Sequence, residues 1–238
     1  MLPVEISGQL NSEERRIITA AILDAPGKPK IVMEVGTWLG GGSTLHLLRA
    51  LERNGAGHLW GIEADRSIYD QMLENIRRAA PEATHRFTPL FGFSHEVIPN
   101  WLKGLGTEKT VDVVFLDGGN NPSEQIIEFL LVDAYMPVGG ILMTHDAKLR
   151  KGKWLVPYVS RLDNWKSKLH DVSDEGLFFA RKIAPNPSPT NLRSARFRLF
   201  QMRCAPAELA AALLPAKVCD LILRLLPKKL RRGVTEGR

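Results

Sequence analysis

Short apolar runs alternate with helical patterns from residue 31 to residue 144, and this alternation restricts the fold more than any other feature of the sequence. The expected elements are strands at 31–35, 58–62, 86–91, 111–116 and 140–144, and helices at 43–53, 67–79, 95–103 and 122–135. Strands separated by helices in this way form parallel sheets with helices packed on both faces. The sequence therefore predicts an α/β, Rossmann-like fold with a mostly parallel central sheet.

Two further segments extend this core. Asn11 and Glu14 have the spacing of a capping box, which predicts a helix before the first strand. Beyond residue 146 we expect a helix at 153–162, followed by an antiparallel edge formed by 168–173 and 176–184.

The C-terminal part of the chain differs in composition from the rest. The proline-rich stretch 185–191 predicts a boundary between a domain at 1–184 and a basic, helical extension at 185–238. Residues 214–233 alternate apolar and basic side chains at near-helical spacing. A segment with this pattern can lie on an anionic membrane surface, bind a partner or a second subunit of a homo-oligomer, or cover the sheet with a solvated outer face. Nucleic acid is not expected, because few aromatic residues are interleaved with the basic ones.

Composition and cysteine content indicate the compartment. The 238 residues are 44% hydrophobic and 24% charged, as in an ordinary globular protein with one main core. The N-terminus lacks the features of a signal peptide, and no apolar run approaches the ~20 residues that span a bilayer. Cys204 and Cys219 cannot form a disulfide framework. We expect a cytoplasmic protein, with peripheral membrane contact through the tail as an open alternative.

The segment after the first strand contains four glycines, at positions 36, 40, 41 and 42. A strand that leads through glycines into a helix presents backbone N–H groups to a bound ligand. The alternative is a tight turn, which needs only one or two glycines. The segment lacks both the G-x-G-x-x-G spacing of dinucleotide sites and the G-x-x-x-x-G-K-[ST] of nucleoside triphosphate loops. Neither nucleotide-binding fingerprint is therefore present.

Glu34, Gly36 and Gly40 form the pattern E-x-G-x-x-x-G, which resembles the first motif of class I S-adenosylmethionine-dependent methyltransferases. In that family the glycine turn lies against the methionine part of the cofactor, and the acidic residue fixes the site from beneath. A G-G-S sequence follows in many O-methyltransferases and is one residue longer here, so either Gly42 or Ser43 takes the place of the serine. The cofactor contacts implied for this turn are Glu34, Gly36, Thr37, Trp38, Gly40, Gly42 and Ser43.

Two later segments continue the resemblance in the right order. Glu63, after the second strand, corresponds to the acid that accepts both ribose hydroxyls, with Asp65 as the alternative. Residues 92–102 resemble the segment that frames the adenine in catechol-type O-methyltransferases, with Ser94 and His95 at the contact positions. Trp38 and Phe93 are aromatic residues near strand ends, which either cover a cofactor or belong to the core. The cofactor contacts implied for these later segments and the fourth strand are Glu63, Ala64, Asp65, Phe93, Ser94, His95 and Asp117.

The resemblance also implies catalytic residues. In catechol-like and sugar O-methyltransferases, acidic residues after the fourth and fifth strands hold a divalent cation that lowers the pKa of the acceptor hydroxyl. Asp117 and Asp146 occupy these positions and are the implied ligands of Mg²⁺. His145 is a general base, a metal ligand or a hydrogen-bonding residue of the loop, and Asp146 has the alternative role of a loop or cap carboxylate. The family's lysine three residues after the fourth-strand aspartate is replaced by Asn120.

Together these motifs cover roughly residues 10–180. The resemblance implies an S-adenosylmethionine-dependent methyltransferase that acts on a hydroxyl of a small molecule or sugar, with or without a divalent metal. Two alternatives remain at this point. One is a nicotinamide-dependent oxidoreductase built on the same sheet. The other is a non-catalytic cofactor-binding protein that is tethered to a membrane or partner by its basic tail.

Overall fold

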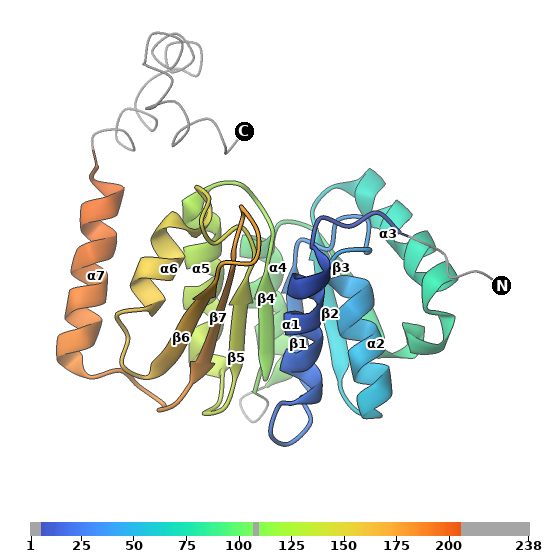
Figure 1. The fold of residues 1–238 in the computed structure, drawn as a ribbon, viewed down its shortest axis with the longest axis horizontal. Helices are drawn as coiled ribbons and strands as arrows, with labels where there is room; N and C mark the ends of the chain where they lie inside the picture. Colours follow the sequence, from blue (N-terminus) through green and yellow to red (C-terminus); the bar gives the residue numbers. More distant parts are fainter. Residues whose placement is uncertain (1–5, 107–109, 206–238) are drawn as a thin grey trace, which may run out of the picture.

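The computed structural model describes residues 6–106 and 110–205. A seven-stranded sheet forms the centre of the protein (Figure 1). The strand order is β3-β2-β1-β4-β5-β7-β6. The strands are β1 (Ile31–Val35), β2 (His58–Glu63), β3 (Phe87–Phe91), β4 (Val113–Leu116), β5 (Ile141–Thr144), β6 (Trp165–His170) and β7 (Leu177–Lys182). Strands β1 to β5 pair in parallel, whereas β7 is antiparallel to both β5 and β6. The predicted parallel sheet and its antiparallel edge are both confirmed.

Seven α-helices connect and cover the strands within the described residues. They are α1 (Ser12–Leu23), α2 (Thr44–Asn54), α3 (Arg66–Ala79), α4 (Ser94–Leu105), α5 (Pro122–Val132), α6 (Gly152–Val159) and α7 (Pro189–Arg203). Two short 3₁₀ helices, η1 (Pro81–Arg86) and η2 (Asp133–Tyr135), follow α3 and α5. Capping boxes begin α1 at Asn11 and α5 at Asn121, so the local sequence signals fix where both helices start.

The helices form a layer on each face of the sheet, and the strands alternate their side chains between these layers. In β4, Val113 and Phe115 pack with the layer of α1, α2 and α3, whereas Val114 and Leu116 pack with the layer of α4 to α7. All four side chains are fully buried. The strand is therefore covered on both faces, as its continuous apolar sequence predicts.

Helix α7 begins inside the proline-rich stretch. Ser188 caps its N-terminus and Pro189 occupies the first turn, where a missing backbone N–H costs nothing. Ala195 and Met202 are buried on the face of α6, so α7 packs onto the rest of the fold. The boundary at residue 185 stays a prediction, and residues 214–233 lie outside the described residues.

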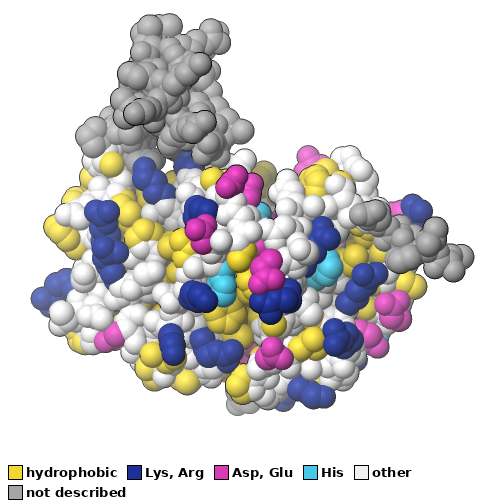
Figure 2. All heavy atoms as spheres, in the orientation of Figure 1, with side chains coloured by type: hydrophobic (Ala, Val, Ile, Leu, Met, Phe, Trp, Pro, Cys, Tyr) yellow, Lys and Arg dark blue, Asp and Glu magenta, His cyan; other side chains and the backbone are white. Residues whose placement is uncertain are grey.

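The charges on the surface are mixed. Figure 2 shows Lys and Arg side chains spread over the face that carries α1, with Asp and Glu side chains between them. Within residues 6–106 and 110–205, no helix is both long enough and apolar enough to cross a membrane.

Candidate functional site

The candidate site lies at the carboxyl ends of the strands, where the chain order reverses between β1 and β4. Ligands of open α/β sheets bind in the crevice at this point. Hydrogen bonds extend the sheet beyond the strand ends, from Gly36 N to the Ile62 carbonyl at 2.9 Å and from Asp117 N to the Val35 carbonyl at 2.8 Å. The sheet itself therefore places Gly36 and Asp117 side by side.

Backbone conformation and contacts within the chain account for three of the four glycines after β1, including Gly40, which has a φ of +86° and whose Cβ would lie 3.0 Å from Ile76 Cδ1. Gly36 has a φ of +84°, and a Cβ there would lie 2.6 Å from the carbonyl oxygen of Asp117. A Cβ at Gly41 would lie closer than 3.0 Å to the carbonyl oxygens of Ile6 and Ser7. The backbone of the N-terminal segment thus passes directly over Gly41. Gly42 has only ordinary contacts, the nearest being 3.4 Å from Leu10 Cδ1.

Glu34 is completely buried beneath this turn. Its Oε1 accepts a hydrogen bond from the hydroxyl of Ser43, so Ser43 rather than Gly42 is the residue placed against the acid. Its Oε2 has no hydrogen-bond partner among the described residues, and the same is true of the buried Thr37 hydroxyl. Burial raises the pKa of Glu34 to about 8, and the negative charges of Asp117 and Glu63 act in the same direction. The unpaired oxygen leaves one acidic group beneath the turn open to a ligand, and a positively charged ligand there would favour its ionised form.

Glu63 organises the turn after β2. Its carboxylate accepts hydrogen bonds from the backbone N–H groups of Ala64 at 2.9 Å, Asp65 at 3.0 Å and Trp38 at 2.9 Å. The last bond holds Trp38 at a φ of +45°. Asp65 instead caps α3, because its Oδ1 accepts from the backbone N–H of Ile68 at 3.0 Å. The two acids therefore have different structural tasks.

The segment after β3 presents aromatic side chains to solvent. Phe93 is exposed, and its ring centroid lies 5.8 Å from that of His95, which is also exposed. Ser94 begins α4 and donates a 2.6 Å hydrogen bond to Oε1 of Glu128 on α5. Burial raises the pKa of Glu128 to about 7. The sequence analysis missed Glu128, because a glutamate within a helix carries no local signal of such a contact.

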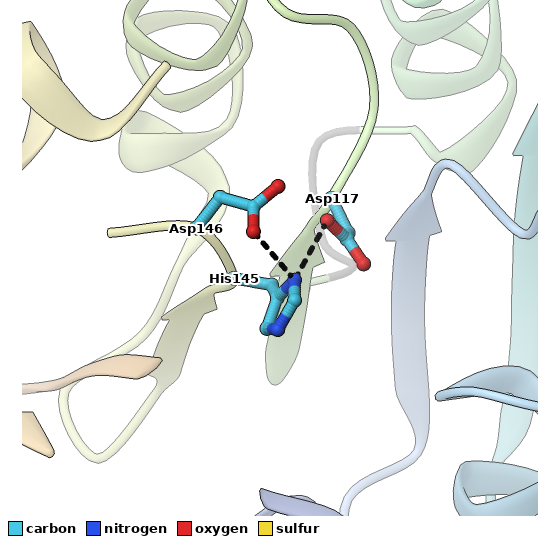
Figure 3. A group of neighbouring side chains, drawn as sticks. All are labelled: Asp117, His145 and Asp146. Atoms are coloured by element: carbon cyan, nitrogen blue, oxygen red, sulfur yellow. Dashed lines mark ion pairs between the residues drawn. The ribbon is translucent and has the colours of Figure 1, made fainter. Parts of the chain in front are cut away.

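Asp117, His145 and Asp146 meet at the ends of β4 and β5 (Figure 3). His145 Nδ1 lies 3.4 Å from Asp117 Oδ1 and 3.2 Å from Asp146 Oδ1. One potential ligand atom from each of the three residues lies within 4.8 Å of the others. The structure thus brings the three predicted catalytic residues together.

Two residues that the sequence analysis missed complete this cluster. Glu14 of α1 lies 3.5 Å from His145 Nε2 and accepts a 2.6 Å hydrogen bond from the Ser173 hydroxyl. Lys151 Nζ lies 2.7 Å from Asp117 Oδ1 and 2.6 Å from Asp146 Oδ2. The cluster therefore contains three carboxylates and two basic side chains. The sequence signal for Lys151 was its place in a basic loop directly after the predicted ligands.

The charges of the cluster reinforce one another. Burial lowers the pKa of His145, but the neighbouring carboxylates of Asp117, Glu14 and Asp146 outweigh this and raise the pKa to about 10. Burial likewise lowers the pKa of Lys151, and its two aspartates raise it above the usual value. Conversely, burial raises the pKa of Glu14, but His145, Ser173 and the backbone of Asn11 bring it down to about 2. All of these directions favour the charged forms.

Comparison with known proteins agrees with this architecture. Residues 33–147 match a family model described as a methyltransferase domain. No curated protein sequence matches the chain. A provisionally named O-methyltransferase from Klebsiella pneumoniae superimposes with a TM-score of 0.60 at 18% identity, over 74% of this chain and 82% of that one. The resemblance to class I methyltransferases is thereby confirmed, as is the fold class.

Two further solved structures share the fold. An O-methyltransferase from Bacillus cereus, in complex with SAH, has a TM-score of 0.58 at 17% identity, over 76% of this chain and 84% of that one. An SAH-bound methyltransferase from Podospora anserina has a TM-score of 0.58 at 14% identity, over 74% of this chain and 80% of that one. At these identities the superpositions establish a common fold.

Proposed function

We propose that this protein is an S-adenosylmethionine-dependent methyltransferase that methylates a hydroxyl group of a small molecule or sugar. One observation carries the proposal: Glu34 lies near the carboxyl end of β1, Glu63 ends β2 and Asp117 follows β4, so the three acids lie on adjacent strands at the point where the strand order reverses. Three carboxylates suit a cofactor with a sulfonium, an ammonium group and ribose hydroxyls. The match to a methyltransferase domain and the SAH bound to relatives of the same fold support this choice.

In this proposal the residues around the glycine turn hold the cofactor. The unpaired Oε2 of Glu34 lies beneath the turn. Glu63, at the end of β2, would accept hydrogen bonds from the ribose hydroxyls. The exposed ring of Phe93 is available to the adenine beside the start of α4, where the Ser94 hydroxyl donates to Glu128 and keeps its lone pairs as acceptors. When bound, the cofactor supplies a methyl group on a positively charged sulfur.

The cluster at β4 and β5 is assigned to the acceptor. Methyl transfer would form an oxygen–methyl bond and break the sulfur–methyl bond of the cofactor, and the proton of the acceptor would pass to a base. A pKa of about 10 keeps His145 protonated at neutral pH, so the histidine is a poor base in this arrangement. The proposal therefore assigns proton acceptance to Asp117 and Asp146, and gives His145 the task of orienting them. No observation favours a nicotinamide-dependent oxidoreductase or a non-catalytic tether.

The test is calorimetric titration of the full chain with S-adenosylhomocysteine. Glu63→Gln should weaken binding roughly 10- to 100-fold, because hydrogen bonds to a charged group contribute about 1.5–3 kcal/mol. Asp65→Asn is the matched control, since asparagine caps a helix as well as aspartate does and should leave affinity unchanged. Absence of binding to the wild-type chain, or equal affinity of the Glu63→Gln chain, would overturn the proposed function.

A methyl-transfer assay then identifies the acceptor class. The full chain is incubated with cofactor labelled on the methyl group and a panel of catechols, other small hydroxylated molecules and sugars. Transfer to one class and not the others supports the proposal. Binding of S-adenosylhomocysteine without transfer to any hydroxyl would limit the conclusion to cofactor binding.

A further inference from the structure

The ammonium group of Lys151 lies between the two carboxylates that the family resemblance assigns to a metal ion. Its Nζ is 2.7 Å from Asp117 Oδ1 and 2.6 Å from Asp146 Oδ2. A third acceptor, the backbone carbonyl of Asp117, lies at 3.3 Å. An ammonium group has three N–H donors, so these three acceptors match its full capacity.

The position of Lys151 is built into the fold. Only 6% of its side chain is exposed, against 10% for Asp117 and 16% for Asp146. A lysine buried to this degree is rare unless its charge is paired. The ion pairs are thus part of the interior and differ from a surface lysine that folds back onto an acid.

The loop from β5 to α6 brings Lys151 back over Asp146. Asp146 adopts a φ of +55°, a conformation that aspartate tolerates better than most residues. The backbone N–H of Leu149 donates to the Asp146 carbonyl at 3.0 Å. A Cβ at Gly152 would lie 2.5 Å from the carbonyl oxygen of Ala147, so the loop is packed tightly on itself. The backbone therefore fixes both members of the ion pair.

The same oxygens cannot serve the lysine and a divalent cation together. Mg²⁺ requires oxygen ligands at about 2.0–2.1 Å in near-octahedral geometry. An ion that bound both carboxylates would lie next to the ammonium group, and the two positive charges would repel each other. The distances between the ligand atoms of Asp117, His145 and Asp146 would allow a metal ion. The ammonium group of Lys151, which already lies between the two aspartates, opposes one.

We propose that Lys151 is the resident cation of this site and replaces the divalent metal between Asp117 and Asp146. Lys151 is a positioning residue, which fixes the orientation of both aspartates at the ends of β4 and β5. The protein then binds its acceptor and transfers the methyl group without a divalent cation. This last consequence rests on the proposed function, whereas the replacement of the metal does not.

Titration of the full chain with Mn²⁺, followed by electron paramagnetic resonance of the free ion, tests the replacement without any assay of activity. The wild-type chain should show no specific site. Lys151→Ala should gain Mn²⁺ affinity by at least about tenfold, because the site then carries one more uncompensated negative charge. The gain should disappear when Asp146→Ala is added. Lys148→Ala is the matched control. Lys148 Nζ lies 2.6 Å from Asp171 Oδ1 at the surface, and loss of this ion pair should create no Mn²⁺ site.

Three results would overturn the proposal. These are a specific Mn²⁺ site in the wild-type chain, failure of Lys151→Ala to gain one, and methyl transfer that EDTA abolishes and Mg²⁺ restores. If Lys151→Ala does not fold by circular dichroism, the wild-type titration and Lys151→Arg, which should gain no Mn²⁺ affinity, still decide the matter. Failure to bind S-adenosylhomocysteine would remove the proposed function and leave the Mn²⁺ result interpretable.

Discussion

Replacing Gly41 with alanine is expected to destabilise the protein, whereas the same change at the neighbouring Gly42 is not. The two glycines occupy the same turn, but only Gly41 lies directly under the backbone of residues 6–8. A methyl group there must either push against the carbonyl oxygens of Ile6 and Ser7 or lift the segment away. Comparing the two variants therefore measures the effect of the close contact between Gly41 and the backbone of residues 6 and 7.

Both routes lead to a similar cost. Overpacking of a tight contact costs about 1–3 kcal/mol. If the segment lifts instead, the buried side chain of Ile6 becomes exposed, which costs about 1.5–3 kcal/mol. For a chain of this size the melting temperature should fall by about 2–12 °C. Gly42→Ala should remain within about 1 kcal/mol of the wild type, because its Cβ makes only ordinary contacts.

Thermal unfolding of the ligand-free chain, followed by circular dichroism, measures the difference between the two variants. Titration with S-adenosylhomocysteine on the same samples separates packing from ligand contact. Equal melting temperatures for the two variants would refute the packing argument. If Gly41→Ala also lost S-adenosylhomocysteine binding while its melting temperature stayed unchanged, the glycine would serve the ligand and not the N-terminal segment.

Two further predictions concern pH. The pKa of Glu34 is about 8 in the fold and 4.5 in the unfolded chain, so its contribution to stability is greatest below pH 4.5 and is lost as the pH rises to about 8. Between pH 5 and pH 8, denaturant unfolding should show that the wild type loses up to about 4 kcal/mol of stability relative to Glu34→Gln; an equal difference between the two chains at both pH values contradicts this. For His145 the pKa is about 10 in the fold against 6.5, so the stability it contributes is complete below pH 6.5 and is lost towards pH 10. Glu14→Gln removes one of its partners and should move this loss to lower pH, which an NMR titration of the histidine ring would show and an identical titration curve would exclude.

The local sequence already determined the architecture. Apolar runs, helical periodicity and caps such as Asn11 and Asn121 act over a few residues, so they can be read without knowing the fold. Because parallel strands end at one edge of a sheet, the acids at the carboxyl ends of β1, β2 and β4 could also be assigned to a common site. The predicted cluster of Asp117, His145 and Asp146 follows from the same rule.

Only the tertiary structure decided which groups meet these acids. Lys151 is 34 positions away from Asp117 in the sequence, yet the two side chains form an ion pair. Glu14, which lies 3.5 Å from His145, comes from the first helix of the chain. The passage of the N-terminal segment over Gly41 is equally remote from any local pattern. Such partners depend on how loops and helices return to the sheet edge, and this is fixed by packing of the whole domain. The sequence by itself therefore located Asp117, His145 and Asp146, and the fold supplied Lys151 and Glu14 as their partners.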